Sequence, residues 1–335
     1  MHLPFRITAV TATRLTALAL LVTALAPPLA AQRAARPRST TPPGWRLAWH
    51  DEFAGTTVDT TKWGFDLGNG FTGDNGVYVA GWGNDELQCY TSDPKNVFVS
   101  GGSLHLRARR GGAEGCAFTS ARLRTRRRDG SALFAATYGR FEFRARLPVG
   151  QGIWPALWML PHDTKYGTWA ANGEIDIMEA RGQTPSTVLG TLHYGARWPK
   201  NVHTGMDYVL PRGGTIADFH VYALEWEPGR IRWLVDGVAY QEQRFWWSSA
   251  AMADGQGVMP AGESDLHPWP APFDRPFHLL MNLAVGGRFL GNPDATTPFP
   301  ATMEVDWVRV FERRGGAGAL SPRGAGLLPW AQPSR

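Results

Sequence analysis

Short segments in which apolar and polar residues alternate, separated by glycine and proline, fill the sequence from Trp45 to Glu312. In the segment 140–148, "RFEFRARLP", apolar residues alternate with charged ones from Arg140 to Leu147. Successive side chains of a β-strand point to opposite faces, so this pattern predicts strands with one buried face. Other segments of the same kind are "SLHLRAR", "FHVYALEWEPGRIRWLVDGVAYQEQ", "FHLLMNLAVGG" and "MEVDWVRVFE".

The sequence shows neither a long segment with helical period nor a repeat at a fixed spacing. A purely parallel sheet is therefore excluded, because its strands need crossover connections that are usually helices. Many short strands separated by turns predict an all-β sandwich or barrel. We expect one domain, residues 45–312, which is an ordinary size for such a fold.

Both ends of the chain differ from this pattern. Residues 1–31 combine a basic start, a short apolar stretch and small residues at Ala30 and Ala31, as a signal peptide does. An uncleaved membrane anchor is the alternative, although the apolar stretch is short for a span. We expect cleavage and a secreted or periplasmic protein without membrane contact. Residues 32–44 and 313–335 are predicted to be a disordered linker and tail.

The formal net charge of +5 does not describe the predicted domain. Nine of the 34 basic residues, all arginines, lie in 1–44 and 313–335, where there are no acidic residues. The remaining 25 basic and 29 acidic residues give the domain a net charge near −4. No nucleic-acid partner is predicted, because such proteins concentrate basic residues.

Two cysteines, Cys89 and Cys116, are present. In an oxidising compartment they could form a disulfide that stabilises the fold by about 3 kcal/mol. Sequence spacing does not show whether their Cα atoms are close enough, so both states remain open at this point.

The run "GEIDIMEA", residues 173–180, places three acids in a predicted strand. Glu174 and Asp176 share one face by simple alternation, whereas Glu179 would turn to the buried face. An unpaired buried carboxylate is costly. One extra residue, a β-bulge at Met178, returns Glu179 to the face of the other two acids.

Three carboxylates in a row repel one another and raise each other's pKa. Retaining glycoside hydrolysis uses such a set, with one carboxylate attacking the sugar and another donating a proton. The alternatives are a site for a hard cation and an ordinary solvent-facing strand. Trp154, Trp158 and Trp169 lie close in sequence to the acids, and aromatic platforms favour a sugar-binding cleft.

The run "GEIDIMEA" resembles the signature of glycoside hydrolase family 16. The sequence resembles in particular the bacterial laminarinases of that family, which are endo-β-1,3-glucanases. The resemblance extends from Trp45 to Phe311 through "WHDEF", "GWGNDELQCYT", "YGRFEFRARLPVGQGIWPALWML", "GTLHYG" and "NLAVGG". It implies a jelly-roll sandwich of two antiparallel sheets with a concave substrate cleft. It also implies Glu174 as nucleophile, Asp176 as assisting acid and Glu179 as general acid/base.

The resemblance also assigns residues around the acids. Asn84 and Arg122 match positions that bind glucosyl hydroxyls, and His193 matches a histidine near the acids. Trp154, Trp158 and Trp169 match cleft aromatics. Asp85 stands where laminarinases commonly have asparagine, so the resemblance implies the reaction but not the fine specificity.

No cofactor is expected for the chemistry. A structural calcium away from the cleft is common in the family, and Glu52, the carbonyl of Gly102 and Asp306 match its ligands. The expected partner is a polysaccharide, β-1,3-glucan, and the expected state is a monomer. The alternatives are a hydrolase or transglycosylase of mixed-linkage glucan, agarose or carrageenan, and a non-catalytic glucan-binding lectin. A lectin would not need the three acids.

Overall fold

The structure is a computed structural model that describes residue 1 and residues 41–73, 76–113, 115–253 and 256–315. The predicted signal peptide, most of the predicted linker and the tail from residue 316 lie outside the described residues. Among those described, we find no helix that is long and apolar enough to cross a membrane.

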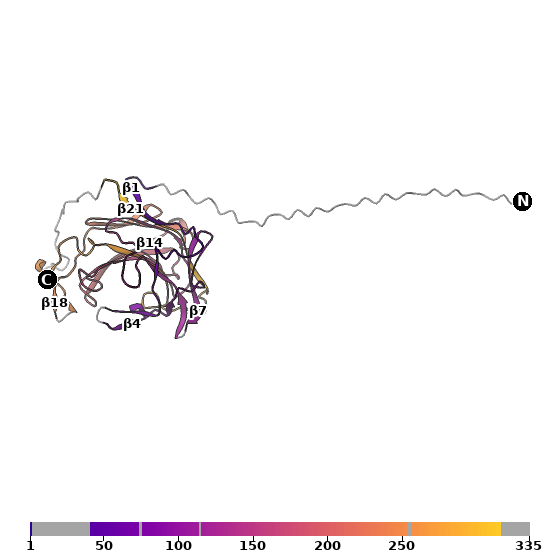
Figure 1. Cartoon of the computed structure of the whole chain (residues 1–335), viewed down its shortest axis with the longest axis horizontal. Coiled ribbons are helices and arrows are strands. Elements are labelled where there is room, and N and C mark those ends of the chain that lie inside the picture. The colour runs from indigo at the N-terminus through magenta and orange to yellow at the C-terminus, as the bar shows by residue number, and fades with distance from the viewer. Residues whose placement is uncertain (2–40, 74–75, 114, 254–255, 316–335) are drawn as a thin grey trace. The chain divides into compact units, whose positions relative to one another are not determined.

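Two large sheets make up the domain, as the sequence predicts, and Figure 1 shows their strands in stacked layers. The strands of the larger sheet are, in spatial order, β17 (Val238–Gln243), β16 (Arg230–Val235), β15 (His220–Glu227), β10 (Gly139–Arg146), β21 (Ala301–Arg313), β7 (Ser103–Ala113), β8 (Cys116–Ser120) and β5 (Gln88–Tyr90). In addition, β1 (Trp45–Asp51) pairs with β21, and β6 (Val97–Ser100) pairs with β7. The smaller sheet runs β14 (Asn201–Val209), β13 (Thr187–Gly195), β12 (Glu174–Glu179), β11 (Ile153–Pro161), β20 (Phe277–Val285), β9 (Arg122–Arg124) and β2 (Gly64–Phe65).

The remaining elements are short. Two hairpins pair β3 (Gly70–Thr72) with β4 (Tyr78–Ala80) and β18 (Met252–Ala253) with β19 (Gln256–Gly257). Single 3₁₀ turns are η1 (Gly81–Gly83), η2 (Pro211–Gly213) and η3 (Glu263–Asp265). All pairings between these strands are antiparallel except that of β5 with β8. The all-β jelly-roll prediction is confirmed.

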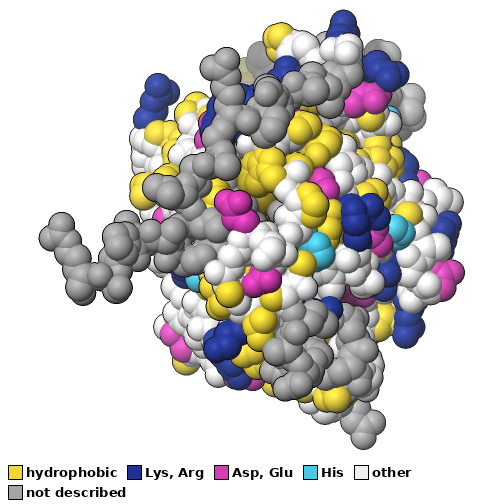
Figure 2. Space-filling model, turned by 90° about the vertical axis from the view of Figure 1, so that its left-hand side faces the viewer, with side chains coloured by type: hydrophobic (Ala, Val, Ile, Leu, Met, Phe, Trp, Pro, Cys, Tyr) yellow, Lys and Arg dark blue, Asp and Glu magenta, His cyan; other side chains and the backbone are white. Residues whose placement is uncertain are grey.

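The core lies between the two sheets and is supplied by alternate residues of each strand. Phe141 and Phe143 of β10 are fully buried, and so are Ile175 of β12 and Leu279 of β20. Charged side chains of both signs are interspersed on the face seen in Figure 2, as expected for a domain whose charges nearly balance. The alternation that predicts the strands therefore also selects the core.

Backbone hydrogen bonds join residues next to the predicted ends of the domain. The first strand begins at Trp45 and the last ends at Arg313. The N–H of Trp45 bonds the carbonyl of Pro42 at 3.1 Å, and the N–H of Arg314 bonds Gly44 at 2.9 Å. These backbone hydrogen bonds hold residues on both sides of the predicted boundaries.

The predicted bulge is present in β12. Trp158 of β11 opposes Asp176, but the preceding Leu157 opposes Met178, so Ile177 is the extra residue on this side. Ile177 and Met178 are both buried in the core, at 2% and 1% exposure. The bulge thus spans two residues rather than Met178 alone, and both apolar side chains face inward.

Candidate active site

The bulge places Glu174, Asp176 and Glu179 on one face of β12. Each is opposed there by a cross-strand neighbour, and directly opposed residues of an antiparallel pair share a face. Glu174 is opposite His193 of β13, and Asp176 is opposite Trp158 of β11. This is the arrangement predicted from the spacing of two and then three residues.

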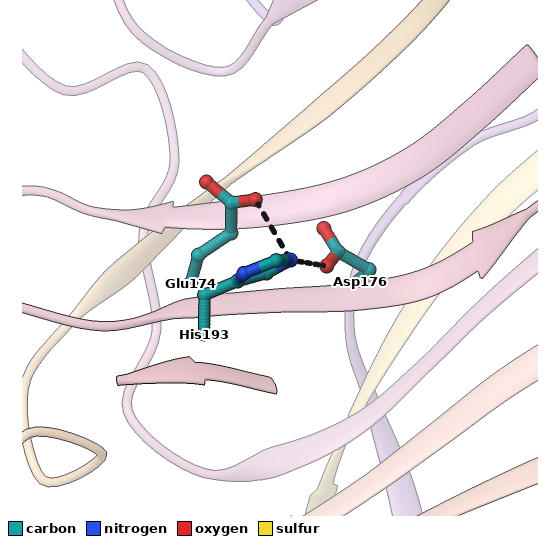
Figure 3. Close-up of side chains that lie close together, drawn as sticks. All are labelled: Glu174, Asp176 and His193. Carbon is teal, nitrogen blue, oxygen red and sulfur yellow. Dashed lines mark ion pairs between the residues drawn. The ribbon is translucent and has the colours of Figure 1, made fainter. Parts of the chain in front are cut away.

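Asp176 and Glu174 converge on the imidazole of His193 (Figure 3). The Nε2 atom of His193 lies 3.3 Å from Oδ2 of Asp176 and 3.9 Å from Oε1 of Glu174. Asp176 is almost completely buried, at 3% exposure. The histidine predicted to lie near the acids therefore bridges two of them.

Two tryptophans bind the outer two acids. Trp169 precedes β12 and donates its indole N–H to Oε2 of Glu174 at 2.9 Å. Trp154, in β11, donates to Oε1 of Glu179 at 3.0 Å. Each predicted catalytic glutamate thus has its own indole donor, and Trp169 remains 40% exposed.

Burial dominates the electrostatics of the glutamates. Removal from water, together with the neighbouring charge of Asp176, raises the pKa of both Glu174 and Glu179 to about 8. For His193, burial opposes the charged form, but the hydrogen bond to Asp176 and the negative charge of Glu174 outweigh it. They raise the pKa of His193 to about 9. Near neutral pH the site therefore holds a protonated histidine and at least one carboxyl proton, as acid catalysis requires.

Asn84 lies beside an acid that the sequence reasoning missed. Its Nδ2 donates to Oε1 of Glu86 at 3.2 Å, and Gln88 donates to Oε2 of the same carboxylate at 2.7 Å. The hydroxyl of Tyr90 also reaches Glu86, at 3.3 Å. Burial raises the pKa of Glu86 despite these partners. The signal was available in the alternation of Glu86, Gln88 and Tyr90, which puts three polar groups on one face.

Arg122 lies between two aromatic rings. Its guanidinium carbon is 4.5 Å from the ring centre of Trp82 and 4.6 Å from that of Trp158. Its Nε atom lies 2.9 Å from Oδ2 of Asp66. Trp158, predicted as a cleft aromatic, therefore has a guanidinium against its ring, and its indole N–H bonds Asn282 at 2.7 Å. In this structure the ring of Trp158 holds Arg122 on the face of the sheet that carries the three acids.

Asp85, the departure from the usual asparagine, forms an ion pair with Arg288. The Nε–Oδ2 distance is 2.6 Å, and both side chains are largely exposed. The backbone N–H of Arg288 also bonds the carbonyl of Asn84 at 2.8 Å. The ion pair between Asp85 and Arg288 thus joins two loops next to Asn84.

The residues expected to hold calcium carry other partners. Glu52 forms two hydrogen bonds with Arg309, each of 2.7 Å, and Asp306 bonds Arg144 at 2.6 Å. An ion at this position would have to share both carboxylates with guanidinium groups. Calcium stays a prediction, and we assign it no step of the chemistry.

Within the described part of the chain, one group of side chains has metal-ligand spacing, namely Glu174, Asp176 and His193. Metal binding requires a neutral imidazole, whereas the raised pKa of His193 favours its protonated form at neutral pH. The electrostatics of this group suit proton transfer better than metal coordination.

Comparison with known proteins decides the family. The model of "Glycosyl hydrolases family 16" matches residues 83–249. A "Beta-glucanase" of Rhodothermus marinus is 44% identical over 290 residues, which cover 82% of this chain and 87% of the relative. The chain belongs to glycosyl hydrolases family 16. The resemblance drawn from the sequence motifs is confirmed.

Other relatives of this family 16 chain carry similar names. "Glucan endo-1,3-beta-glucosidase A1" of Niallia circulans is 44% identical over 283 residues, which cover 81% of this chain but only 38% of that longer protein. The laminarinase catalytic domain of Thermotoga maritima MSB8 superimposes with a TM-score of 0.65 at 37% identity, covering 81% of this chain and 99% of that structure. The fold of this chain thus occurs in a solved laminarinase catalytic domain.

Proposed function

We propose that this family 16 chain is a retaining endo-glycosidase that hydrolyses β-1,3-glucan of the laminarin type. The observation that carries the proposal is the bulged strand β12, which aligns three carboxylates on one face. Each of the two outer carboxylates accepts a hydrogen bond from a tryptophan indole. The names of the relatives support the choice of β-1,3-glucan.

In the first step the carboxylate of Glu174 attacks the anomeric carbon and forms a glycosyl ester. The bond from that carbon to the bridging oxygen breaks, and Glu179 gives its proton to the leaving oxygen. In the second step Glu179 removes a proton from water, whose oxygen attacks the same carbon and releases Glu174. Asp176 and His193 contact each other beside Glu174. They balance the charge there as Glu174 loses its negative charge in the first step and regains it in the second.

The stereochemistry of the first product tests the mechanism. Proton NMR of early products from a β-glucan should show the β-anomer, because two displacements retain configuration. An initial α-anomer would contradict the proposal.

The two roles are separable by azide rescue. Glu174→Gly with azide should yield an α-glycosyl azide, since azide replaces the nucleophile. Glu179→Ala should yield the β-azide, because azide then intercepts the glycosyl ester. If the anomers were exchanged, the roles would be reversed.

The polymer is tested by product profiles on laminarin, lichenan and agarose. We expect internal cleavage of laminarin at the highest rate. Faster cleavage of agarose would contradict the β-1,3-glucan assignment while leaving the retaining mechanism intact.

We also propose that the protein is secreted or periplasmic and acts as a monomer. A disulfide between Cys89 of β5 and Cys116 of β8, with Cα atoms 5.8 Å apart, supports an oxidising compartment. Fractionation of the native host with N-terminal sequencing tests export and cleavage near Ala31. Gel filtration with light scattering tests the monomer.

A further inference from the structure

A buried tryptophan of the opposite sheet contacts the backbone of the catalytic strand. Trp233, in β16, is fully buried in the core between the sheets. Its indole N–H donates to the backbone carbonyl of Asp176 at 2.7 Å. The larger sheet therefore reaches through the core to the strand that carries the acids.

This hydrogen bond falls where the strand register changes. Against β13, Asp176 is opposite Thr191 and Glu179 is opposite Leu189, so two residues of β12 share one position of its neighbour. A bulge disrupts the ladder locally, and a buried carbonyl at such a point needs a donor. Trp233 supplies one from outside the sheet.

The neighbouring strand leaves room for the indole. Gly190 occupies the position between Thr191 and Leu189, beside the bulge. A Cβ atom added at Gly190 would lie 2.3 Å from Cδ1 of Trp233. Glycine at this position is thus needed for the indole to reach the carbonyl.

We propose that Trp233 is a positioning residue for the catalytic acids, acting through the backbone of Asp176. Its hydrogen bond fixes where the bulge begins, and so sets the placement of the Asp176 carboxylate against His193. The inference rests on the proposed function, since it assumes that Asp176 assists Glu174. Misplacing a reacting group by about 1 Å costs on the order of a hundredfold in rate, so a fraction of that shift is measurable.

The test replaces Trp233 by phenylalanine, which keeps an aromatic ring but removes the N–H. A matched control exists in β15, where Trp226 is also fully buried and donates its indole N–H to the carbonyl of Phe273 at 3.2 Å. Both substitutions remove one buried indole hydrogen bond. Only that of Trp233 ends on the acid strand.

For Trp233→Phe we expect kcat to fall about tenfold with little change in KM. We also expect the pKa of His193, measured by NMR titration, to fall from about 9 towards the ordinary value of 6.5. For Trp226→Phe we expect a similar loss of Tm with kcat and the His193 pKa unchanged. Gly190→Ala should reproduce the Trp233→Phe effects by displacing the indole.

Equal changes in kcat and in the His193 pKa for the two tryptophan variants would overturn the proposal, because the role would then be general stability. The NMR titration needs no substrate. It therefore distinguishes a failure of this inference from a failure of the proposed β-1,3-glucanase activity, which would show as inactivity of the unaltered protein on laminarin.

Discussion

The indole Nε1 of Trp154 lies 3.0 Å from Oε1 of Glu179 and donates a hydrogen bond to it. Such a bond favours the ionised carboxylate, and it lowers the pKa of Glu179 against the effect of burial. Trp169 does the same for Glu174. In the proposed mechanism Glu179 must be protonated to act as the general acid, whereas Glu174 must be ionised to attack. Loss of the Trp154 bond should therefore affect the pH profile differently from loss of the Trp169 bond.

Trp154→Phe should shift the alkaline limb of the kcat/KM profile to higher pH. Without the indole donor the pKa of Glu179 rises further, so the general acid stays protonated to a higher pH. We expect a shift of about one to two pH units, because a hydrogen bond to a charged group contributes roughly 1.5–3 kcal/mol and one pKa unit is about 1.4 kcal/mol. We also expect a lower kcat. The measurement is the rate on laminarin from pH 4 to pH 10.

Trp169→Phe should shift the acidic limb of the same profile upward. Here the raised pKa belongs to the nucleophile, which must be ionised to attack, so activity is lost first at low pH. The phenylalanine ring retains an aromatic surface, and KM should change little. If Trp169→Phe moved the alkaline limb and Trp154→Phe the acidic one, the assignment of the two glutamates would have to be exchanged.

Glu179→Gln should stabilise the protein at alkaline pH while abolishing turnover. The carboxyl titrates near 4.5 when unfolded and near 8 when folded. The unfolded state therefore releases its proton first, and the free energy of unfolding falls as pH rises between these values. Glutamine has no proton to lose, so this destabilisation disappears.

We expect a gain on the order of 1–3 kcal/mol at pH 8.5, seen as a rise in Tm of about 2–4 °C per kcal/mol. At pH 4, where the wild-type carboxyl is neutral in both states, the two proteins should melt together. A Tm difference that is the same at both pH values would show that proton linkage is not its cause. The same substitution at the exposed Glu263, Glu263→Gln, serves as the matched surface control.

Deleting Ile177 should remove the bulge and leave the acids at even spacing. All three would still share a face by alternation, but Glu179 would move by up to one residue rise, about 3.3 Å. We expect a folded protein with activity reduced a hundredfold or more, yet detectable. Circular dichroism and the rate on laminarin provide the comparison.

Met178→Leu is the matched variant for this deletion, because it keeps the residue count and nearly conserves the buried volume. It should retain most of the activity. Met178→Ala is a poorer control, because Met178 is buried at 1% exposure and its truncation would cost about 2–5 kcal/mol. Equal losses for the deletion and for Met178→Leu would contradict the role of the register.

The sequence by itself determined the strands and the order of the acids. Both depend on the local period of two, which needs no knowledge of the neighbouring strand. The spacing of Glu174, Asp176 and Glu179 even predicted the bulge, because each other arrangement would bury an unpaired charge. The nearby tryptophans could be connected with the acids for the same reason, since Trp169 is only five residues from Glu174.

Only the tertiary structure decided which distant groups meet. Arg309 and Arg144 pair with Glu52 and Asp306, the carboxylates that the resemblance predicts as calcium ligands. Arg122 lies between the rings of Trp82 and Trp158. Trp233 reaches Asp176 across 57 residues and from the other sheet. Such contacts depend on how two twisted sheets pack face to face, and the alternation of a single strand carries no information about its partner across the core.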